Sequence, residues 1–204
     1  MGRVSDAKEK LMDAVLELLW TGSYGGTTID DICAKADVKK GSFYYFFKSK
    51  GDLAIAALDR AYKEKRVELD RIFSPTVPPL DRIRNYLDFS YEMQAKMKAE
   101  CGCVLGCPLF TLGAEVSTQE QKLRAKIEEI LEHHGKYLES AIRDAHAAGA
   151  ISAPDAALKA RVIRAYFEGL LTQARIQNDC EVLRELPKGV MSILGVEEKE
   201  AVAA

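Results

Sequence analysis

The chain has 204 residues, 48% of them hydrophobic and 29% charged, which is the balance of a globular protein with a substantial core. Its length allows one domain, or a small domain joined to a larger one. A formal net charge of -2 excludes a protein that coats nucleic acid through overall basicity, although it leaves room for a local basic surface.

Neither secretion nor membrane insertion is expected. The N-terminus lacks the basic and then apolar pattern of a signal peptide, and no apolar run is long enough to span a bilayer. The five cysteines are odd in number and come without an export signal, so a disulfide framework is not expected. We therefore expect a cytoplasmic protein with reduced thiols and no membrane partner.

Helical periodicity dominates the sequence from its N-terminus. Ser5, followed by acidic residues, is the expected N-cap of a first helix that ends at Gly22. After a glycine-rich loop, Thr28 and Asp31 have the spacing of a capping box, with Asp in place of the usual Glu. This pair predicts a short helix over residues 28–36.

A tight turn at Asp37 and Val38 separates that helix from a second short one, and a long helix with a proline-rich break follows. Pro154 is expected in the first turn of a late helix, and the tail is expected to fray. The remaining helices are predicted over residues 40–47, 50–72, 80–97, 109–116, 119–147, 154–178 and 181–194, and the tail over 197–204.

The predicted fold is all-α and has two domains. Residues 1–50 form an N-terminal three-helix domain, the helix 50–72 connects it to the rest, and residues 73–204 form a larger helical domain. Within the first domain, the two short helices joined by a tight turn have the arrangement of a helix-turn-helix. In this motif the second helix enters the DNA major groove.

The second short helix and its flanks are basic and aromatic, as a DNA-reading helix requires. Gly41 permits a close backbone approach to the duplex, and the helix N-terminus at Thr28 offers a phosphate site. Val38, Phe43 and Phe47 are expected to face inward. The candidate DNA-binding residues are Thr28, Lys39, Lys40, Gly41, Ser42, Tyr44, Tyr45, Lys48 and Lys50.

The alternative interpretation of these lysines is a solvent-exposed basic turn on a helical protein, with no role in DNA binding. Residues 35–50 contain five lysines against one aspartate, which would fit either interpretation. The tyrosines and phenylalanines among these lysines favour the DNA-reading interpretation, because exposed aromatic side chains on a polar helix need a functional reason.

The stretch from Thr27 to Leu53 resembles the signature of the TetR family of bacterial repressors, and the resemblance extends over about residues 5–65. Two positions depart from the family pattern: Phe46 stands where Tyr or His is frequent, and Gly51 stands where Glu is usual. The resemblance implies a repressor that binds a palindromic double-stranded DNA operator as a homodimer. It also implies an effector pocket in the C-terminal domain and release from DNA when a small-molecule or electrophilic effector fills it.

An apolar stripe supports the homodimer independently of the resemblance. Apolar residues recur every four positions in the helix predicted over residues 154–178, and neighbouring ones widen the stripe. This helix can bury part of its apolar surface in its own domain and the rest against the second protomer of a two-fold dimer. Alternatively, the whole surface can be buried in the core of its own domain. The candidate interface residues are Leu158, Val162, Tyr166, Phe167, Leu170, Leu171 and Ala174.

Three cysteines, Cys101, Cys103 and Cys107, lie within seven residues at a predicted helix break. Their stretch, with Ala114-Glu115-Val116, resembles a subgroup of the family that includes electrophile- and oxidant-responsive repressors. The thiols can be buried hydrophobes, a metal site of uncommon spacing, or sensors activated by a cation such as Arg175 or by a helix N-terminus. Cys103 is the thiol that we single out as the sensor.

Other function classes have less support. The sequence lacks a glycine-rich nucleotide fingerprint, a zinc-protease motif and a nucleophile elbow, so we expect no enzyme, no catalytic residues and no cofactor. His133 and His134 lack the spacing of a di-metal site, and we interpret them as solvated or pocket-lining residues. We therefore assign no metal ligand. The alternative is a thiol- or metal-dependent all-α enzyme, or a metal- or redox-buffering protein.

Overall fold

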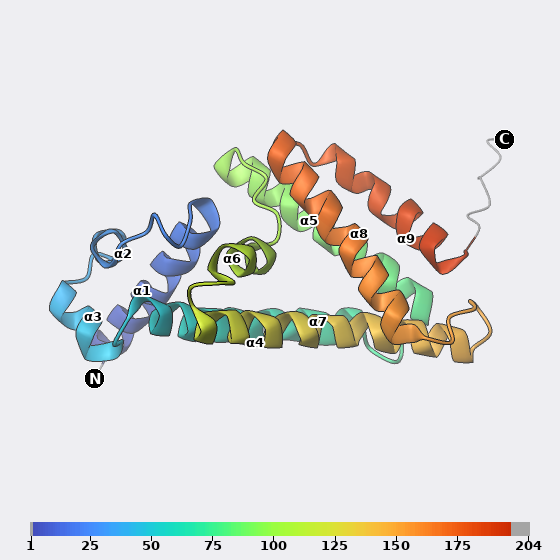
Figure 1. The fold of residues 1–204 in the computed structure, drawn as a ribbon, viewed down its shortest axis with the longest axis horizontal. Helices are drawn as coiled ribbons and strands as arrows, with labels where there is room; N and C mark the ends of the chain where they lie inside the picture. The colour runs from blue at the N-terminus through green and yellow to red at the C-terminus, as the bar shows by residue number, and fades with distance from the viewer. Residues whose placement is uncertain (1, 197–204) are drawn as a thin grey trace. The chain divides into compact units, whose positions relative to one another are not determined.

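A computed structural model describes residues 2–196 of the chain, with side chains from residue 6 onward, and every regular element in that part is helical (Figure 1). This confirms the all-α prediction. No helix in the described part is long and apolar enough to cross a membrane. The elements are α1 (Gly2–Thr21), α2 (Ile29–Ala36), α3 (Lys40–Phe46), α4 (Lys50–Ile72), α5 (Pro79–Cys101), α6 (Pro108–Val116), α7 (Gln121–Ala147), α8 (Ala156–Gln177), the 3-10 helix η1 (Glu181–Glu185) and α9 (Leu186–Leu194).

Helix boundaries differ from the sequence prediction at several places, and α5 extends to Cys101 where we predicted an end at residue 97. α1 begins at Gly2, so Ser5 is not its N-cap. Asp155 caps α8 by accepting a hydrogen bond from the Leu158 N–H, and Pro154 therefore precedes the helix instead of lying in its first turn. The last predicted helix is divided into η1 and α9, and the tail at 197–204 lies outside the described residues.

The described chain divides into two compact units. Residues 2–67 and 108–131 form the N-terminal unit, and residues 68–107 and 132–196 form the C-terminal unit. We predicted that the N-terminal domain ends at residue 50 and that the C-terminal domain begins at residue 73. The sequence did not indicate that α6 and the first turns of α7 pack with the N-terminal helices. α4 and α7 each contribute residues to both units.

The N-terminal unit is built around fully buried side chains from α1 to α4, among them Leu11, Ile32, Phe43 and Leu53. Salt bridges surround this core. Arg60 of α4 pairs with Glu9 and Asp13 of α1, and Lys126 of α7 lies 3.3 Å from the carboxylate of Asp59 of α4. α1, α2 and α3 pack on one another and so form the predicted three-helix arrangement.

The C-terminal unit has a larger core in which α5, α7, α8, η1 and α9 take part, and α8 and α9 run side by side (orange to red in Figure 1). Aromatic rings from four segments meet in this core. Phe73 lies 5.5 Å from Tyr86 and 5.3 Å from Tyr137 between ring centroids, and Tyr86 stacks on Phe167 at 5.5 Å. Burial raises the pKa of the Tyr86 phenol far above its usual value, with Cys107 and Glu168 adding to the effect.

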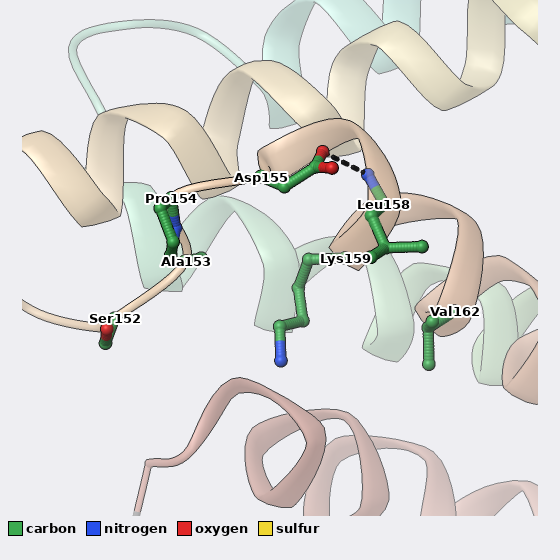
Figure 2. A pocket seen from close by; sticks show the side chains of 7 residues that line it. All are labelled: Ser152, Ala153, Pro154, Asp155, Leu158, Lys159 and Val162. Atoms are coloured by element: carbon green, nitrogen blue, oxygen red, sulfur yellow. Dashed lines mark hydrogen bonds between the residues drawn. The ribbon is translucent and has the colours of Figure 1, made fainter.

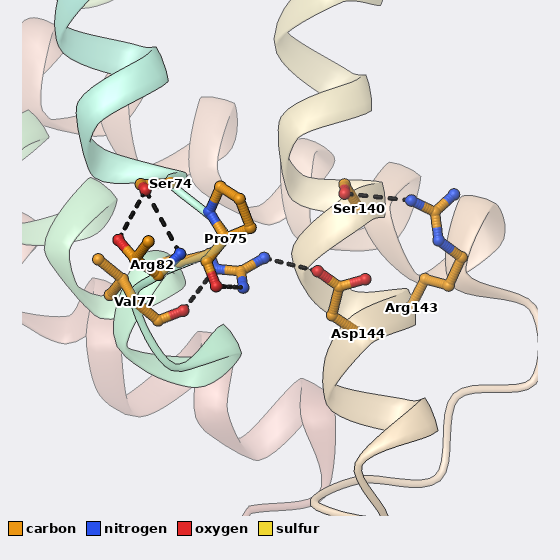
Figure 3. A network of polar contacts seen from close by, with 8 residues as sticks. Ser74, Pro75, Val77, Arg82, Ser140, Arg143 and Asp144 are labelled. Atoms are coloured by element: carbon orange, nitrogen blue, oxygen red, sulfur yellow. Dashed lines mark hydrogen bonds and ion pairs between the residues drawn. The ribbon is translucent and has the colours of Figure 1, made fainter.

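Arg82 fixes the proline-rich turn between α4 and α5 to α7 (Figure 3). Its buried guanidinium donates to the carbonyls of Val77 and Pro75 at 2.7 and 3.1 Å, and pairs with the carboxylate of Asp144 at 2.6 Å. A buried guanidinium needs such partners, because its charge is costly to remove from water. The turn is therefore held by one side chain that satisfies two backbone acceptors.

We expect Asp144→Ala to lower the free energy of unfolding by about 2–3 kcal/mol, because the Arg82 charge stays buried without its counterion. The cost is below that of a fully buried pair, since the Asp144 side chain is partly exposed. Glu132→Ala on the same helix removes an exposed pair with Lys136 and should cost below about 1 kcal/mol. Urea denaturation of the two variants measures the difference, and equal costs would contradict the role of Arg82.

Candidate nucleic-acid interface

The N-terminus of α2 is closed by the predicted capping box. The Thr28 hydroxyl oxygen accepts from the Asp31 N–H at 3.1 Å, and the Asp31 carboxylate accepts from the Thr28 N–H at 2.9 Å. Hydrogen bonds to this carboxylate from the Thr28 hydroxyl and from the Thr28 N–H hold the pKa of Asp31 below its usual value. The Thr28 hydroxyl also donates to Asp31, at 2.6 Å, so a phosphate at this helix end would meet a hydroxyl that is already engaged.

The turn after α2 depends on Asp37, which has a left-handed backbone with φ of 51°. Its N–H donates to the Ala34 carbonyl, and the Val38 N–H donates to the Cys33 carbonyl. Asp is one of the few residues besides Gly that tolerates this conformation. The turn ends α2 and sets the direction in which α3 begins.

α3 has a buried face and a presented face. Phe43 and Phe47 are buried and Val38 is half-buried, as predicted. Tyr44 and Tyr45 are exposed, at 55% and 75% of their surface. The helix backbone is open at Gly41, where an added Cβ would meet no atom within 4 Å.

The predicted DNA-binding residues around α3 lie together on this one element and its flanks. Lys39, Lys40 and Lys48 are exposed, and Ser42 is half-buried. The Lys40 ammonium lies 2.8 Å from the Asp30 carboxylate, and its hydrogen bond to Asp30 raises the pKa of Lys40. DNA phosphate would therefore compete with Asp30 for Lys40.

Lys50 departs from its predicted role at the exit of the reading helix. Its ammonium donates to the carbonyls of Tyr24 and Thr27, at 2.5 and 2.7 Å, and lies 4.1 Å from the centroid of the Tyr24 ring. Partial burial lowers the pKa of Lys50. These carbonyls hold the Lys50 ammonium inside the unit, so a DNA phosphate would have to compete with them for Lys50.

The loop before α2 also has carboxylate partners that the sequence did not indicate. Glu115, at the end of α6, accepts the N–H groups of Tyr24 and Gly25, each at 2.8 Å. Glu120 accepts from the Tyr24 hydroxyl at 2.8 Å. A Cβ at Gly51 would lie 3.4 Å from this hydroxyl and 3.6 Å from Glu120, so the glycine in place of the family's usual Glu adjoins the same carboxylate.

On α8, only part of the predicted dimer stripe is available at the surface. Leu158 and Val162 are exposed, at 48% and 46%. The other predicted residues pack in their own unit, with Tyr166 and Leu170 partly buried against the core and Phe167, Leu171 and Ala174 within it. Ile176, which the sequence reading missed, is 79% exposed.

Leu158 and Val162 adjoin a shallow hollow at the start of α8 (Figure 2). Lys159 crosses toward α9 and donates to the Ile193 carbonyl at 3.0 Å. The hollow is lined by Ser152, Ala153, Pro154, Asp155, Leu158, Lys159 and Val162. It has no cluster of buried polar groups among its lining residues, and it extends the exposed apolar surface of α8.

The cysteine segment between α5 and α6 is irregular, and side-chain amides bind its backbone. Gln94 accepts from the Gly106 N–H and donates to the Gly106 carbonyl, at 2.9 and 3.1 Å. Asn178 accepts from the Val104 N–H and donates to the Gly102 carbonyl, at 2.8 and 3.1 Å. Two side-chain amides thus replace the backbone partners that a helix or sheet would supply.

The three cysteines occupy different surroundings. Cys101 and Cys103 are exposed, and Cys107 is half-buried against the C-terminal core. Cys101 lies at the C-terminus of α5, where its thiol contacts the Met97 carbonyl at 3.1 Å. The Cys101 thiol therefore lies among carbonyl acceptors at a helix C-terminus, and not at a helix N-terminus.

Arg175 and a metal ion were the other proposed partners of the cysteines. Arg175 donates to the Leu105 carbonyl at 2.9 Å, which orders the segment backbone. No group of three metal-ligating side chains occurs among the described residues. His133 and His134 are both half-buried in the C-terminal unit.

Two family models match the chain. A model of bacterial regulatory proteins of the tetR family matches residues 11–57, and a model of the tetracyclin repressor-like C-terminal domain matches residues 79–189. The first match covers α2, the turn and α3, and the second covers most of the C-terminal unit.

Several characterised and uncharacterised regulators are similar to the chain. An uncharacterized HTH-type transcriptional regulator in the lacX 3' region of Lactococcus lactis is 32% identical over 61% of this chain, which spans 62% of that relative. The transcriptional regulator AcuR of Cereibacter sphaeroides is 30% identical over 84% of this chain and 77% of its own length.

The HTH-type transcriptional repressor NemR of Escherichia coli is 26% identical over 93% of this chain and 94% of its own length. A crystal structure of its reduced form superposes with a TM-score of 0.80, at 25% identity, and covers 97% of this chain and 100% of that one.

Proposed function

Because the chain belongs to the TetR family of bacterial regulatory proteins, we propose that it represses transcription by binding a palindromic double-stranded operator as a homodimer. Members of this family bind DNA operators and are regulators, not enzymes. The name of NemR as a repressor supports the direction of regulation. The alternative of a thiol- or metal-dependent enzyme or buffering protein has no support among these relatives.

The observation that carries the proposal is the presented face of α3. Tyr44 and Tyr45 are exposed on a seven-residue helix whose inward side is held by buried Phe43, with buried Phe47 directly after the helix. Lys39, Lys40 and Lys48 flank them. Tyrosine hydroxyls and lysine ammonium groups donate hydrogen bonds to phosphate, and a short helix fits the major groove. In a two-fold dimer, two such helices read the two halves of a palindrome.

We expect operator binding to weaken steeply with salt, because each neutralised phosphate releases about 0.9 counterion. A dimer with several lysine–phosphate contacts should give a log–log slope more negative than about -3. Lys48→Ala should make the slope shallower by about 2, one contact per protomer. Lys188→Ala, an exposed change on α9, should leave it unaltered.

Fluorescence anisotropy with the DNA upstream of the protein's own gene, titrated over a series of salt concentrations, measures these slopes. A slope near zero for the native protein would refute the DNA-binding proposal. Equal slopes for the Lys48 and Lys188 variants would remove Lys48 from the interface.

We further propose that a small-molecule or thiol-reactive effector acts on the C-terminal unit. Of the three clustered cysteines, Cys107 is the one whose side chain packs against the core, close to Tyr86. An adduct on Cys107 must displace packed side chains, whereas an adduct on exposed Cys103 extends into solvent. These surroundings favour Cys107 over Cys103, which the sequence singled out, as the thiol that is coupled to the fold.

A further inference from the structure

The loop over residues 22–27, here called the anchored loop, depends on charged side chains from distant parts of the N-terminal unit. It contains Gly22, Gly25 and Gly26, so its own sequence restricts its conformation weakly. Glu115 and Glu120 bind it from one part of the chain and Lys50 binds it from another. These bonds, and not local propensity, fix its conformation.

Glu115 supplies a paired acceptor for the loop backbone. Its two carboxylate oxygens receive the N–H groups of the consecutive residues Tyr24 and Gly25, each at 2.8 Å. Hydrogen bonds to an ionised carboxylate are stronger than neutral ones, and two together fix orientation as well as distance. An added Cβ at Gly25 would lie 3.4 Å from the same carboxylate, which shows how closely the chain approaches it.

Glu120 binds the loop through a side chain. The Tyr24 ring is buried, and its hydroxyl donates to the Glu120 carboxylate at 2.8 Å. Burial raises the pKa of Tyr24 far above its usual value, and the hydrogen bond to Glu120 adds to the shift. The phenol therefore stays protonated and remains a donor.

Lys50 joins this arrangement to the start of α2. Its ammonium binds the Tyr24 and Thr27 carbonyls, and Thr27 directly precedes Thr28, the N-cap of α2. Glu115 and Glu120 lie near enough to Lys50 to oppose the lowering of its pKa by burial. Two carboxylates, one ammonium and the loop backbone thus form one connected network at the entrance to the helix-turn-helix.

We propose that Glu115 and Glu120 are positioning residues for operator recognition, which set the orientation of α2 and α3 through the anchored loop. The inference rests on the proposed DNA-binding function and adds to it two acidic residues that do not touch DNA. Base contacts require a fixed helix orientation, whereas non-specific phosphate contacts tolerate a mobile one. Loss of the network should therefore lower operator affinity more than affinity for unrelated DNA.

The sign of the effect separates positioning from simple electrostatics. Removing a carboxylate from a DNA-binding protein weakens repulsion from phosphate, so charge alone predicts tighter binding. The network predicts the opposite. Glu115→Gln removes the charge and one of two acceptor oxygens, and it should lower operator affinity about tenfold, or about 1.4 kcal/mol. Glu115→Ala should lower it further.

Glu128→Gln is the matched control. Glu128 is exposed on α7 in the same unit, and its ion pair is with Arg124 of the same helix, at 3.7 Å. The control makes the same change in charge without touching the loop, so its operator affinity should equal or exceed that of the native protein. Fluorescence anisotropy with operator and with a scrambled duplex, at one salt concentration, gives the specificity ratio for each variant.

Glu120 has a conservative substitution that tests hydrogen bonding against charge. In Glu120→Gln, the oxygen of the new side-chain amide can still accept from Tyr24, so this variant should retain near-native specificity. Glu120→Ala and Tyr24→Phe each remove the hydrogen bond and should lower the specificity ratio by similar factors. The double variant should lose no more than either single one, because both changes break the same contact.

Hydrogen exchange of the protein without DNA tests the network independently of its function. The Tyr24 and Gly25 amides should be protected in the native protein and lose protection at least about tenfold in Glu115→Gln, while amides of α7 stay protected. If the native protein bound no DNA while this loss occurred, the DNA-binding proposal would fail and the network would stand.

Three results would overturn the inference. The first is an operator affinity of Glu115→Gln equal to or above that of Glu128→Gln, with both variants folded by circular dichroism. The second is unchanged exchange of the Tyr24 and Gly25 amides in Glu115→Gln. Equal losses on operator and scrambled DNA would also contradict positioning, because they would show a general loss of the DNA-binding surface.

Discussion

Leu158→Glu combined with Val162→Glu is expected to convert the dimer into monomers and to lower operator affinity by about two orders of magnitude or more. Both side chains are exposed on α8 and lie on the side of the helix opposite the buried Phe167. Exposed Ala165, Gly169 and Ile176 continue the same side along the helix. In a two-fold interface the substitutions bury four unpaired charges of one sign.

The loss of DNA affinity follows from the loss of avidity. A dimer holds its second helix-turn-helix near the DNA at high effective concentration, which commonly contributes about 10²–10⁴-fold. Light scattering gives the oligomeric state, and anisotropy gives the affinity. Gln177→Glu, an exposed change about a quarter turn away from Ile176 on α8, is the control and should remain dimeric. A double variant that still dimerises would move the interface away from this side of α8.

Alkylation by N-ethylmaleimide is expected to release the native protein from its operator, with a fall in affinity of about tenfold to a hundredfold. The adduct on Cys107 adds volume beside a close-packed aromatic core, and overpacking commonly costs about 1–3 kcal/mol. A core that cannot absorb this volume shifts to another packing arrangement. Cys107→Ser should bind operator and resist release.

Cys101→Ser and Cys103→Ser serve as matched controls, because both thiols are exposed and near in sequence. Both variants should remain sensitive to the reagent. Mass spectrometry confirms which residues carry an adduct in each sample. Release of the Cys107→Ser protein to the same extent as the native protein would show that the coupling lies elsewhere.

The sequence predicted the helix-turn-helix well because its determinants are local. The capping pair Thr28 and Asp31 is three residues apart, and the left-handed turn at Asp37 depends on one residue type. Phe43 and Phe47 are four residues apart, and both are buried. Such features need no knowledge of distant parts of the chain.

The predicted dimer stripe runs from the surface into the core for a geometric reason. Residues four apart advance about 400° around an α-helix, so a strict four-residue series drifts by about 40° at each step. From Leu158 to Ala174 the drift reaches almost half a turn. The predicted series therefore starts on the exposed side and ends in the core. A series with steps of three and four, through Gly169 to Ile176, stays on one side.

The contacts of the anchored loop could not be predicted from local patterns. Tyr24 and Glu115 are 91 residues apart, and Tyr24 and Glu120 are 96 apart. No periodicity links a loop to a helix end at such a separation. The internal acceptors of Lys50 could not be predicted for the same reason, since they lie 26 and 23 residues earlier. A lysine near a reading helix looks the same in sequence whether it faces DNA or the interior.

The chemical identity of Asn178 has a consequence for the ageing of the protein. Its left-handed backbone, with φ of 50°, ends α8, and its carboxamide both accepts from Val104 and donates to the Gly102 carbonyl. Hydrolysis of this amide to a carboxylate would keep the acceptor for the Val104 N–H but remove the donor. A carboxylate oxygen would then face the Gly102 carbonyl oxygen and repel it. Deamidation of Asn178 would therefore loosen the backbone that carries Cys103.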